Sequence, residues 1–279
     1  MGRVIFVTGF KGGVGKTTVA ANVASSLHAL GKRVLVIDGD FGMRCMDMVL
    51  GAESDTLFDC SDILLGRCSF GAAVTEVKGN PDFLFIPAPM NFGNEKIPES
   101  SFDSLFCELR GEFDFIIVDS GADLTPWYIS FAKHSDEALI VTLHQSASVR
   151  AAEKTASRLS VMGLDEMSLV VNGYRESFAL DGSLPSIPDI ISRSSVRLIG
   201  VVPYGETLQA NQEAAELAFS GDMRKKAFDY EAAFFNIASR LCSKRVKLFE
   251  NVASPKKRCS YEGIRTKSAK SKNKTGVRK

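Results

Sequence analysis

The sequence contains no closely spaced pair of cysteines. Its six cysteines are scattered without a Cys-x-x-Cys motif, which argues against a zinc knuckle or an iron–sulfur scaffold, because both need paired thiolates. We expect these cysteines to be reduced and largely buried. Histidine is also scarce, and His28, His134, His144 and the single tryptophan, Trp127, stand in no recognisable catalytic grouping.

Long apolar runs are missing as well. No run approaches the roughly 18 apolar residues that a membrane-spanning helix needs, and the apolar start over residues 1–7 is too short for a secretory signal. A chain of 279 residues that is 45% hydrophobic and 24% charged is typical of a soluble globular protein and is not disordered throughout. We therefore expect a cytoplasmic protein.

Charge is distributed unevenly along the chain. The whole chain has a formal charge of +1, but residues 254–279 contain ten Lys or Arg and one acid, a net charge of +9, so the remainder carries −8. This end is rich in Lys, Ser and Thr, and we expect it to be disordered when alone. We predict one folded domain over residues 1–249 and a basic tail over residues 250–279.

Short β-branched runs alternate with longer helical stretches. This alternation is typical of an α/β fold with three layers, in which helices cover both faces of a mostly parallel, twisted sheet. The loops that follow the strands then lie along one edge, where ligands of such sheets bind. A helix over residues 17–30 and a last helix over residues 230–244 are expected, and we favour packing of the last helix on the domain over surface binding. Strands are predicted at residues 4–7, 34–37, 83–86, 115–118, 138–141, 169–171 and 198–202.

A glycine-rich loop joins the first predicted strand to the next helix. Residues 11–18 read Lys-Gly-Gly-Val-Gly-Lys-Thr-Thr. Glycines allow the backbone to direct its N–H groups towards phosphate oxygens, and the positive end of the helix dipole adds to the attraction. Lys16 would supply a point charge for the β- and γ-phosphates, and Thr17 would offer its hydroxyl to Mg²⁺.

Three aspartates follow predicted strands. Asp38 and Asp40, two residues apart, point to the same side of the chain at the end of the second strand. Asp119 ends another apolar strand, which would deliver one carboxylate beside the phosphate loop. Together these acids can face a metal-bound nucleotide.

The loop over residues 11–18 resembles the deviant phosphate loop of the MinD/ParA family of ATPases. Phe10 stands where the strict phosphate-loop pattern has glycine, and Lys11 adds a second lysine. Residues 38–51 are similar to the first switch region of the family, within which the septum-placing branch is the nearest. The similarity extends from about residue 3 to residue 247. It implies a P-loop NTPase of the SIMIBI class that hydrolyses ATP with Mg²⁺ and forms an ATP-dependent homodimer.

The resemblance also implies individual roles. Lys11 would cross the dimer interface to the partner's phosphates, Asp40 would position the attacking water, and Lys16 would complete the catalytic set. Thr17, Asp38 and Asp119 would hold Mg²⁺, while Arg44 and Asp47 would lie on a partner-binding surface. The nucleotide itself would contact Lys11, Gly12, Gly13, Val14, Gly15, Lys16, Thr17, Thr18, Asn172 and Pro203.

Adenine is the expected base. The sequence lacks the Asn-Lys-x-Asp tetrad of a guanine site. Asn172 instead ends a strand that matches the family strand whose terminal asparagine recognises adenine, and Pro203 lies in a segment similar to the loop that encloses the base. ATP is therefore favoured over GTP.

The resemblance is weakest at the C-terminus. A MinC-type division inhibitor and a MinE-type activating regulator are the implied partners, but the amphipathic membrane helix of the septum-placing branch has no counterpart in residues 254–279. The basic residues over 240–279 favour peripheral binding to anionic lipid on the inner face of the cell membrane. Binding to nucleic acid, or a tail that contacts only water, are the alternatives. A ParA-like partition ATPase and a flagellar-number regulator stay open, and an iron–sulfur assembly ATPase is disfavoured by the unpaired cysteines.

Overall fold

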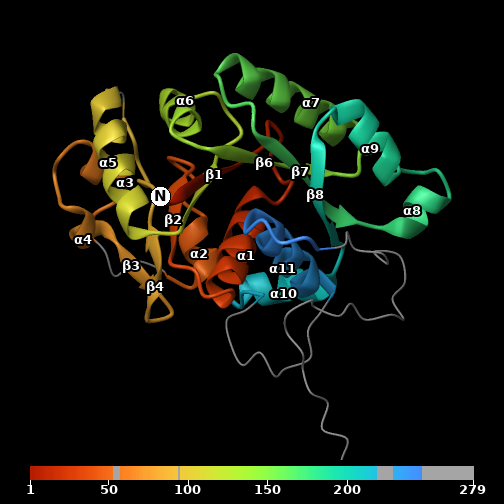
Figure 1. Ribbon diagram of the computed structural model, residues 1–279, viewed down its shortest axis with the longest axis horizontal. Coiled ribbons are helices and arrows are strands. Elements are labelled where there is room, and N and C mark those ends of the chain that lie inside the picture. Colours follow the sequence, from red (N-terminus) through yellow and green to blue (C-terminus); the bar gives the residue numbers. More distant parts are fainter. Residues whose placement is uncertain (53–56, 94, 219–228, 247–279) are drawn as a thin grey trace, which may run out of the picture.

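The computed structural model describes residues 1–52, 57–93, 95–218 and 229–246, which form a single eight-stranded sheet between two layers of helices (Figure 1). The strand order is β3-β4-β2-β5-β1-β6-β7-β8, and every pairing is parallel except that of β3 with β4. All predicted strand segments lie within strands, which confirms the predicted fold class, whereas β3 was not predicted. The strands are β1 (Arg3–Thr8), β2 (Val34–Gly39), β3 (Thr75–Val77), β4 (Asn80–Ile86), β5 (Phe115–Ser120), β6 (Glu137–Leu143), β7 (Met167–Tyr174) and β8 (Arg197–Pro203).

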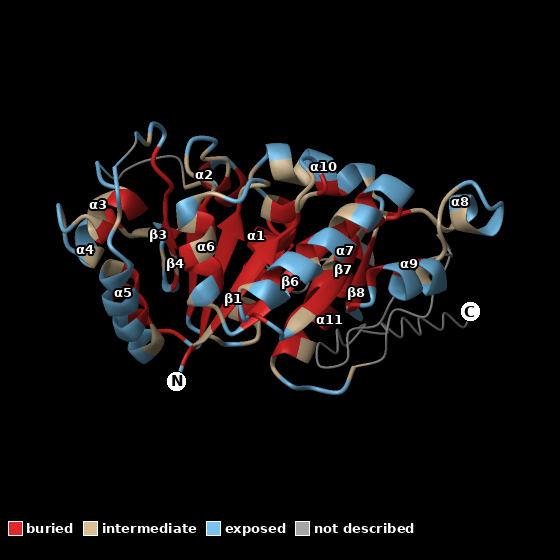
Figure 2. Ribbon diagram, turned by 90° about the horizontal axis from the view of Figure 1, so that it is seen from above, coloured by how far each residue is buried: buried red, intermediate tan, exposed pale blue. Residues whose placement is uncertain are grey.

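Helices cover both faces of the sheet because alternate side chains of each buried strand point to opposite sides. Figure 2 shows the strands buried between helices whose outer surfaces are exposed. One face packs against α1 (Lys16–Ala29), α2 (Met46–Leu50), α10 (Glu206–Glu213) and α11 (Asp229–Leu241). The other packs against α3 (Cys60–Leu64), α5 (Glu99–Glu112), α6 (Pro126–Lys133), α7 (Ser146–Val161) and α9 (Ile187–Ser194), with the short α4 (Phe70–Ala73) and α8 (Glu176–Leu180) at its margin.

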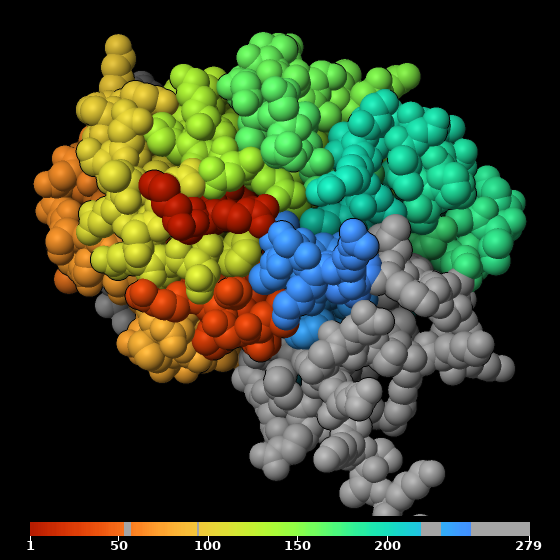
Figure 3. Space-filling model, viewed as in Figure 1, coloured from red at the N-terminus to blue at the C-terminus, as the bar shows by residue number. Residues whose placement is uncertain are grey.

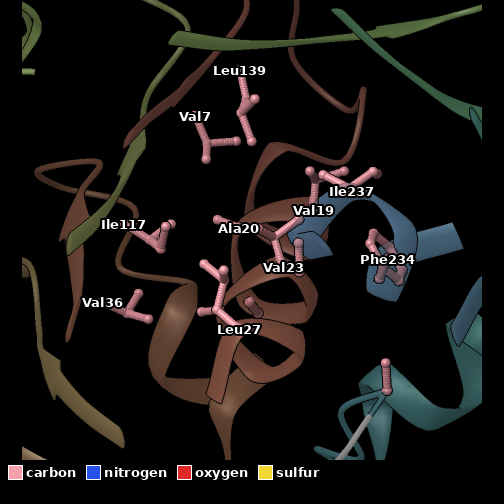
Figure 4. Packing of buried hydrophobic residues seen from close by; sticks show 14 of the residues in the cluster. Val7, Val19, Ala20, Val23, Leu27, Val36, Ile117, Leu139, Phe234 and Ile237 are labelled. Carbon is pink, nitrogen blue, oxygen red and sulfur yellow. The ribbon is translucent and has the colours of Figure 1, made fainter. Parts of the chain in front are cut away.

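Helix α1 is almost wholly buried and forms the centre of the first core cluster. Its Val19, Val23 and Leu27 side chains lie against strand residues such as Val36 and Ile117 (Figure 4). Small residues such as Ala20 and Ala24 bring the helix close to the sheet. The phosphate loop leads directly into α1, so this packing fixes the position of the loop relative to the strands.

Helix α11 packs on the domain, as predicted. Its apolar stripe is buried against α1 and β8. The contact with β8 is so close that a Cβ atom at Gly200 would lie 2.3 Å from Ile237 Cγ1. The helix ends at Leu241, three residues before the expected residue 244. The buried residues of the stripe are Tyr230, Ala233, Phe234, Ile237, Ala238 and Leu241.

The last described residues lie beside the first strand (Figure 3). The Arg3 guanidinium donates a hydrogen bond to the Leu241 carbonyl, which joins the end of α11 to the amino end of β1. Residues 247–279, and with them the expected boundary after residue 249 and the basic tail, lie outside the described part. Within the described part, no helix combines the length and apolar character needed to cross a bilayer.

Candidate functional site

The phosphate loop lies at the carboxyl end of β1. Gly13 and Gly15 adopt left-handed backbone conformations, with φ of 73° and 89°, which glycine tolerates without a Cβ penalty. A Cβ atom at Gly15 would also lie 2.2 Å from Asn172 Nδ2. Gly15 is therefore required both by its backbone angle and by the close approach of a side chain from β7.

Phe10 secures the base of the loop in place of the usual glycine. Its backbone N–H donates to Thr155 Oγ1 at 3.1 Å, and its ring lies 5.8 Å from the ring of Tyr128. The Tyr128 hydroxyl in turn hydrogen-bonds Thr8 Oγ1 at 2.7 Å. The loop is thus attached to α6 and α7 before it turns towards α1.

A cavity of about 980 Å³ opens beside the loop. It extends from the loop to the carboxyl ends of β7 and β8, and its size suits a small-molecule ligand. Asn172 contacts the loop directly, because its Nδ2 donates to the Val14 carbonyl at 2.9 Å. Seven predicted nucleotide-contacting residues line this cavity: Gly13, Gly15, Lys16, Thr17, Thr18, Asn172 and Pro203.

Two of the predicted carboxylates are buried side by side. Asp38 on β2 and Asp119 on β5 are register partners, and they are 0% and 1% exposed. Thr17 Oγ1 donates to Asp119 Oδ2 at 2.6 Å. Asp38 accepts the backbone N–H groups of Asp40 and Met46 at 3.0 and 3.2 Å. The structure therefore brings Thr17, Asp38 and Asp119 together on the strand side of the loop.

Burial raises the pKa of both carboxyl groups. The pKa of Asp38 rises to about 7 and that of Asp119 to about 8, chiefly because the buried site desolvates the charged forms; the Asp38 charge adds to the increase at Asp119, whereas the Thr17 hydroxyl and Lys16 oppose it. A cation beside two desolvated carboxyl groups would stabilise their charged forms and lower both pKa values.

These residues fit a Mg²⁺ ion. Asp119 Oδ1 is buried without a hydrogen-bond partner among the described residues, and the Thr17 hydroxyl lies next to the other oxygen. Magnesium in nucleotide sites is held by one or two such protein oxygens together with phosphates and water. No group of three or more His, Cys, Asp or Glu that could hold a metal ion is found in the described ranges.

Asp40 follows the end of β2, two residues after Asp38. Partial burial raises its pKa, Lys16 opposes the increase, and Asp123 adds to it. A Cβ atom at Gly121 would lie 2.8 Å from Asp40 Oδ1, so the glycine after β5 makes room for this carboxylate. A carboxylate with a raised pKa is a better proton acceptor than an exposed one.

Lys11 does not line the cavity. Its Nζ donates to Gln145 Oε1 at 3.3 Å, a contact to the residue that precedes α7. Gly12 and Gly13 beside it are exposed, and a Cβ atom at either glycine would have no described atom within 4 Å. The Lys11 side chain therefore lies outside the cavity, and its hydrogen bond among the described residues is one long contact to a neutral amide.

Arg44 and Asp47 pair with each other. Arg44 Nε lies 2.8 Å from Asp47 Oδ2, and their side chains are only 13% and 11% exposed. Arg44 also has a positive φ of 42°. The exposed side chains of this segment are instead Met43 and Met48, at 68% and 52%. The pair shapes the segment after β2, and the methionines form its surface.

Three contacts in the site were not predicted from the sequence. Thr18 Oγ1 donates to Gln212 Oε1 at 2.7 Å across 194 sequence positions. The Arg175 guanidinium lies over the Tyr204 ring at 3.5 Å and lines the same cavity. Gln145 Oε1 accepts the hydrogen bond from Lys11 Nζ, as described above. Glutamine and arginine outside a motif carry no local signal of such roles, so only the folded chain reveals them.

The chain is similar to known septum site-determining proteins over most of its length. The family model for an AAA domain matches residues 2–162. The septum site-determining protein MinD of Synechocystis sp. is 32% identical over 254 residues, which cover 91% of this chain and 94% of that protein. Its counterpart from Bacillus subtilis is also 32% identical, covering 89% and 92%.

Solved structures show the same fold. The MinC:MinD cell division protein complex of Aquifex aeolicus contains a chain that superimposes with a TM-score of 0.80 at 29% identity, covering 88% of this chain and 98% of that one. The cell division ATPase MinD of Pyrococcus furiosus gives a TM-score of 0.75 at 26% identity, covering 87% and 99%. The likeness to these two structures therefore covers 88% and 87% of this chain.

Replacement of Asp119 by asparagine tests the electrostatics of the site. Unfolded carboxyl groups titrate near pH 4, so between about pH 4 and pH 8 the folded protein binds more protons than the unfolded chain, and stability falls as the pH rises. Asp119→Asn should be more stable than the original chain at about pH 8.5, by at least about 1 kcal/mol, and nearly equal at about pH 4. Urea unfolding without metal or nucleotide measures the difference.

The exposed Asp82, which lies 3.6 Å from Arg33, provides the control. Asp82→Asn should show no such change of its effect with pH. An Asp119→Asn effect that is the same at both pH values would contradict a raised pKa at Asp119.

Proposed function

Since the chain belongs to the MinD/ParA family of P-loop ATPases, we propose that it is an ATP-hydrolysing dimerisation switch in division-site placement. The main support for this proposal is one observation. Residues of the phosphate loop line a single cavity with Asn172 and Pro203, and the buried pair Asp38 and Asp119 lies near the same loop. The septum site-determining names of the relatives support the cellular role.

ATP would lie with its phosphates on the loop and its base towards Asn172 and Pro203. The loop N–H groups and Lys16 neutralise phosphate charge, which is the main requirement of phosphoryl transfer. Thr17, Asp38 and Asp119 hold Mg²⁺, which when bound neutralises further charge on the phosphates. Asp40 orients the attacking water and accepts its proton. ADP and phosphate are the products.

Dimerisation would involve the exposed amino end of the loop. In the described chain the Lys11 ammonium is held only by the Gln145 amide oxygen at 3.3 Å, a long hydrogen bond to an uncharged acceptor. The phosphates of a second copy would offer Lys11 a far stronger contact, because donor and acceptor would then carry opposite charges. Binding of ATP would in this way favour the closed pair of subunits, and hydrolysis would favour their separation.

The segment after β2 is our proposed partner surface. Arg44 and Asp47 hold its shape through their ion pair, while Met43 and Met48 are exposed on it. Flexible methionines suit surfaces that adapt to a partner. The Aquifex aeolicus relative occurs in a MinC:MinD complex, which supports a MinC-type division inhibitor as one partner, and a MinE-type regulator would stimulate hydrolysis.

Asp40→Ala tests the catalytic assignment. Loss of the group that orients water should lower ATP turnover by about 100-fold or more, while ATP binding is retained because Asp40 is not among the residues proposed to hold the nucleotide or Mg²⁺. Lys16→Ala should abolish binding itself. Phosphate release and calorimetric titration distinguish the two effects, and full turnover by Asp40→Ala would remove this residue from the mechanism.

Lys11→Ala tests the dimer interface. With a non-hydrolysable ATP analogue and Mg²⁺, the original chain should become a dimer in light scattering, whereas Lys11→Ala should remain monomeric because the charge-assisted contact across the interface is lost. Lys32→Ala, which changes a lysine in the loop between α1 and β2, is the matched control. Equal dimer content in the Lys11 variant and the original chain would refute the role of Lys11.

Membrane recruitment is the remaining part of the proposal. Arg240 donates to the Ile199 carbonyl and Leu241 is buried, so a lipid contact would begin at the exposed residues 243–245 and continue into the tail. The net charge of +9 over residues 254–279 supports attraction to anionic lipid at about 1 kcal/mol per basic residue. The same charge favours DNA as the second candidate ligand of the tail.

Co-sedimentation decides between these ligands. The full chain with ATP should bind liposomes that contain anionic lipid more strongly than DNA at matched salt, and a chain cut after Ala253 should lose most of that binding. Stronger binding to DNA would favour a partition-type function, and equal lipid binding by the shortened chain would exclude the tail as the contact.

A further inference from the structure

Helix α10 is attached to the helix that follows the phosphate loop. Thr18 Oγ1 on α1 donates to Gln212 Oε1 on α10 at 2.7 Å. One turn further along α1, Asn22 Oδ1 accepts the backbone N–H of Ala218 at 2.8 Å. Leu208 and Leu217 pack into the same core cluster as α1. These contacts fix α10 against α1 and therefore fix the position of Gln212.

The side-chain amide of Gln212 has a bonded oxygen and an unbonded NH₂ group. Its carbonyl oxygen accepts from Thr18, while its NH₂ group has no hydrogen-bond partner among the residues that the structure describes. The residue is partly buried and lines the 980 Å³ cavity. A planar amide that is held by its oxygen keeps its two N–H donors in a defined direction.

The place of Gln212 in the cavity indicates what those donors would meet. Lys16 and Thr17 at the start of α1 and Pro203 and Tyr204 at the carboxyl end of β8 line this same cavity. Thr18, which holds Gln212, follows the phosphate-binding residues on α1. The part of a bound nucleotide between its terminal phosphates and its base is the ribose with the α-phosphate, and its exposed oxygens are hydrogen-bond acceptors.

We infer that Gln212 is a nucleotide-binding residue that donates its amide N–H to oxygens of the ribose and α-phosphate, with Thr18 as the residue that positions it. This inference rests on the proposed function, because it assigns a contact within the same nucleotide site. ATP and ADP share these oxygens, so Gln212 contributes equally to both and does not sense the γ-phosphate.

Two substitutions separate this role from simple support of Thr18. Gln212→Ala removes both the oxygen and the donors, whereas Gln212→Glu retains an oxygen that can accept from Thr18 but removes the donors and adds a negative charge. Thr207→Ala is the matched control, because Thr207 is exposed on the same helix and does not line the cavity.

Calorimetric titrations with ATP and with ADP, both with Mg²⁺, measure the effect. Gln212→Ala should weaken binding of both nucleotides by about tenfold, which lies between the value of a hydrogen bond to a neutral ribose oxygen and that of one to a charged phosphate oxygen. Gln212→Glu should weaken both by about tenfold or more, with a larger loss at low salt because charge repulsion is then less screened. Thr207→Ala should bind like the original chain.

Affinity of Gln212→Glu equal to that of the original chain would overturn the inference, since Gln212 would then act only through Thr18. A loss for ATP without a loss for ADP would also overturn it. In either case the original chain would still bind and hydrolyse ATP, so the proposed function would stand. If the original chain bound neither nucleotide, the proposed function and this inference would both fail.

Discussion

The parallel pairing of β2 with β5 places Asp38 directly beside Asp119, and the remainder of the site depends on this register. Strand β5 also pairs with β1, where Val7 lies beside Asp119, so the loop that leaves β1 reaches the two acids at once. A shift of one residue in either pairing would turn a carboxylate to the opposite face of the sheet. The order of β2, β5 and β1 therefore determines where the two carboxyl groups and the phosphate loop meet.

The cores on both faces hold these acids in an unfavourable environment. Strand residues next to them are fully buried, and α1 covers the sheet on one side while α6 covers it on the other. Desolvation is what raises the pKa of each carboxyl group. A protein can tolerate such groups in three ways: by protonating them, by pairing them, or by binding a cation. Thr17 donates to only one oxygen of Asp119, and the other has no hydrogen-bond partner in the described chain.

Much of this arrangement could be predicted from the sequence, because the strands are continuous apolar runs and the loop of residues 11–18 has a strong local pattern. Strand β3 was missed, since Thr75–Val77 is short and only partly buried. Arg44 and Asp47 illustrate a second limit: the resemblance implied a partner-binding role for both, which stays a prediction, but it gave no sign that the two side chains pair with each other at the start of α2. Gln212 shows a third, because its partner lies 194 positions away and this glutamine stands in no recognisable motif.

Asn172 serves two parts of the site, because its Nδ2 both supports the Val14 carbonyl and occupies the space beside Gly15. Under the proposed function, the side chain expected to recognise the base is thus also a structural element of the loop expected to bind the phosphates. In evolutionary terms, base preference and phosphate affinity would then be linked through one residue, and a change here would alter the loop before it altered selectivity. Divergence in base choice would more easily occur at Tyr204 and Arg175, which stack on each other in the cavity lining and lie outside the loop.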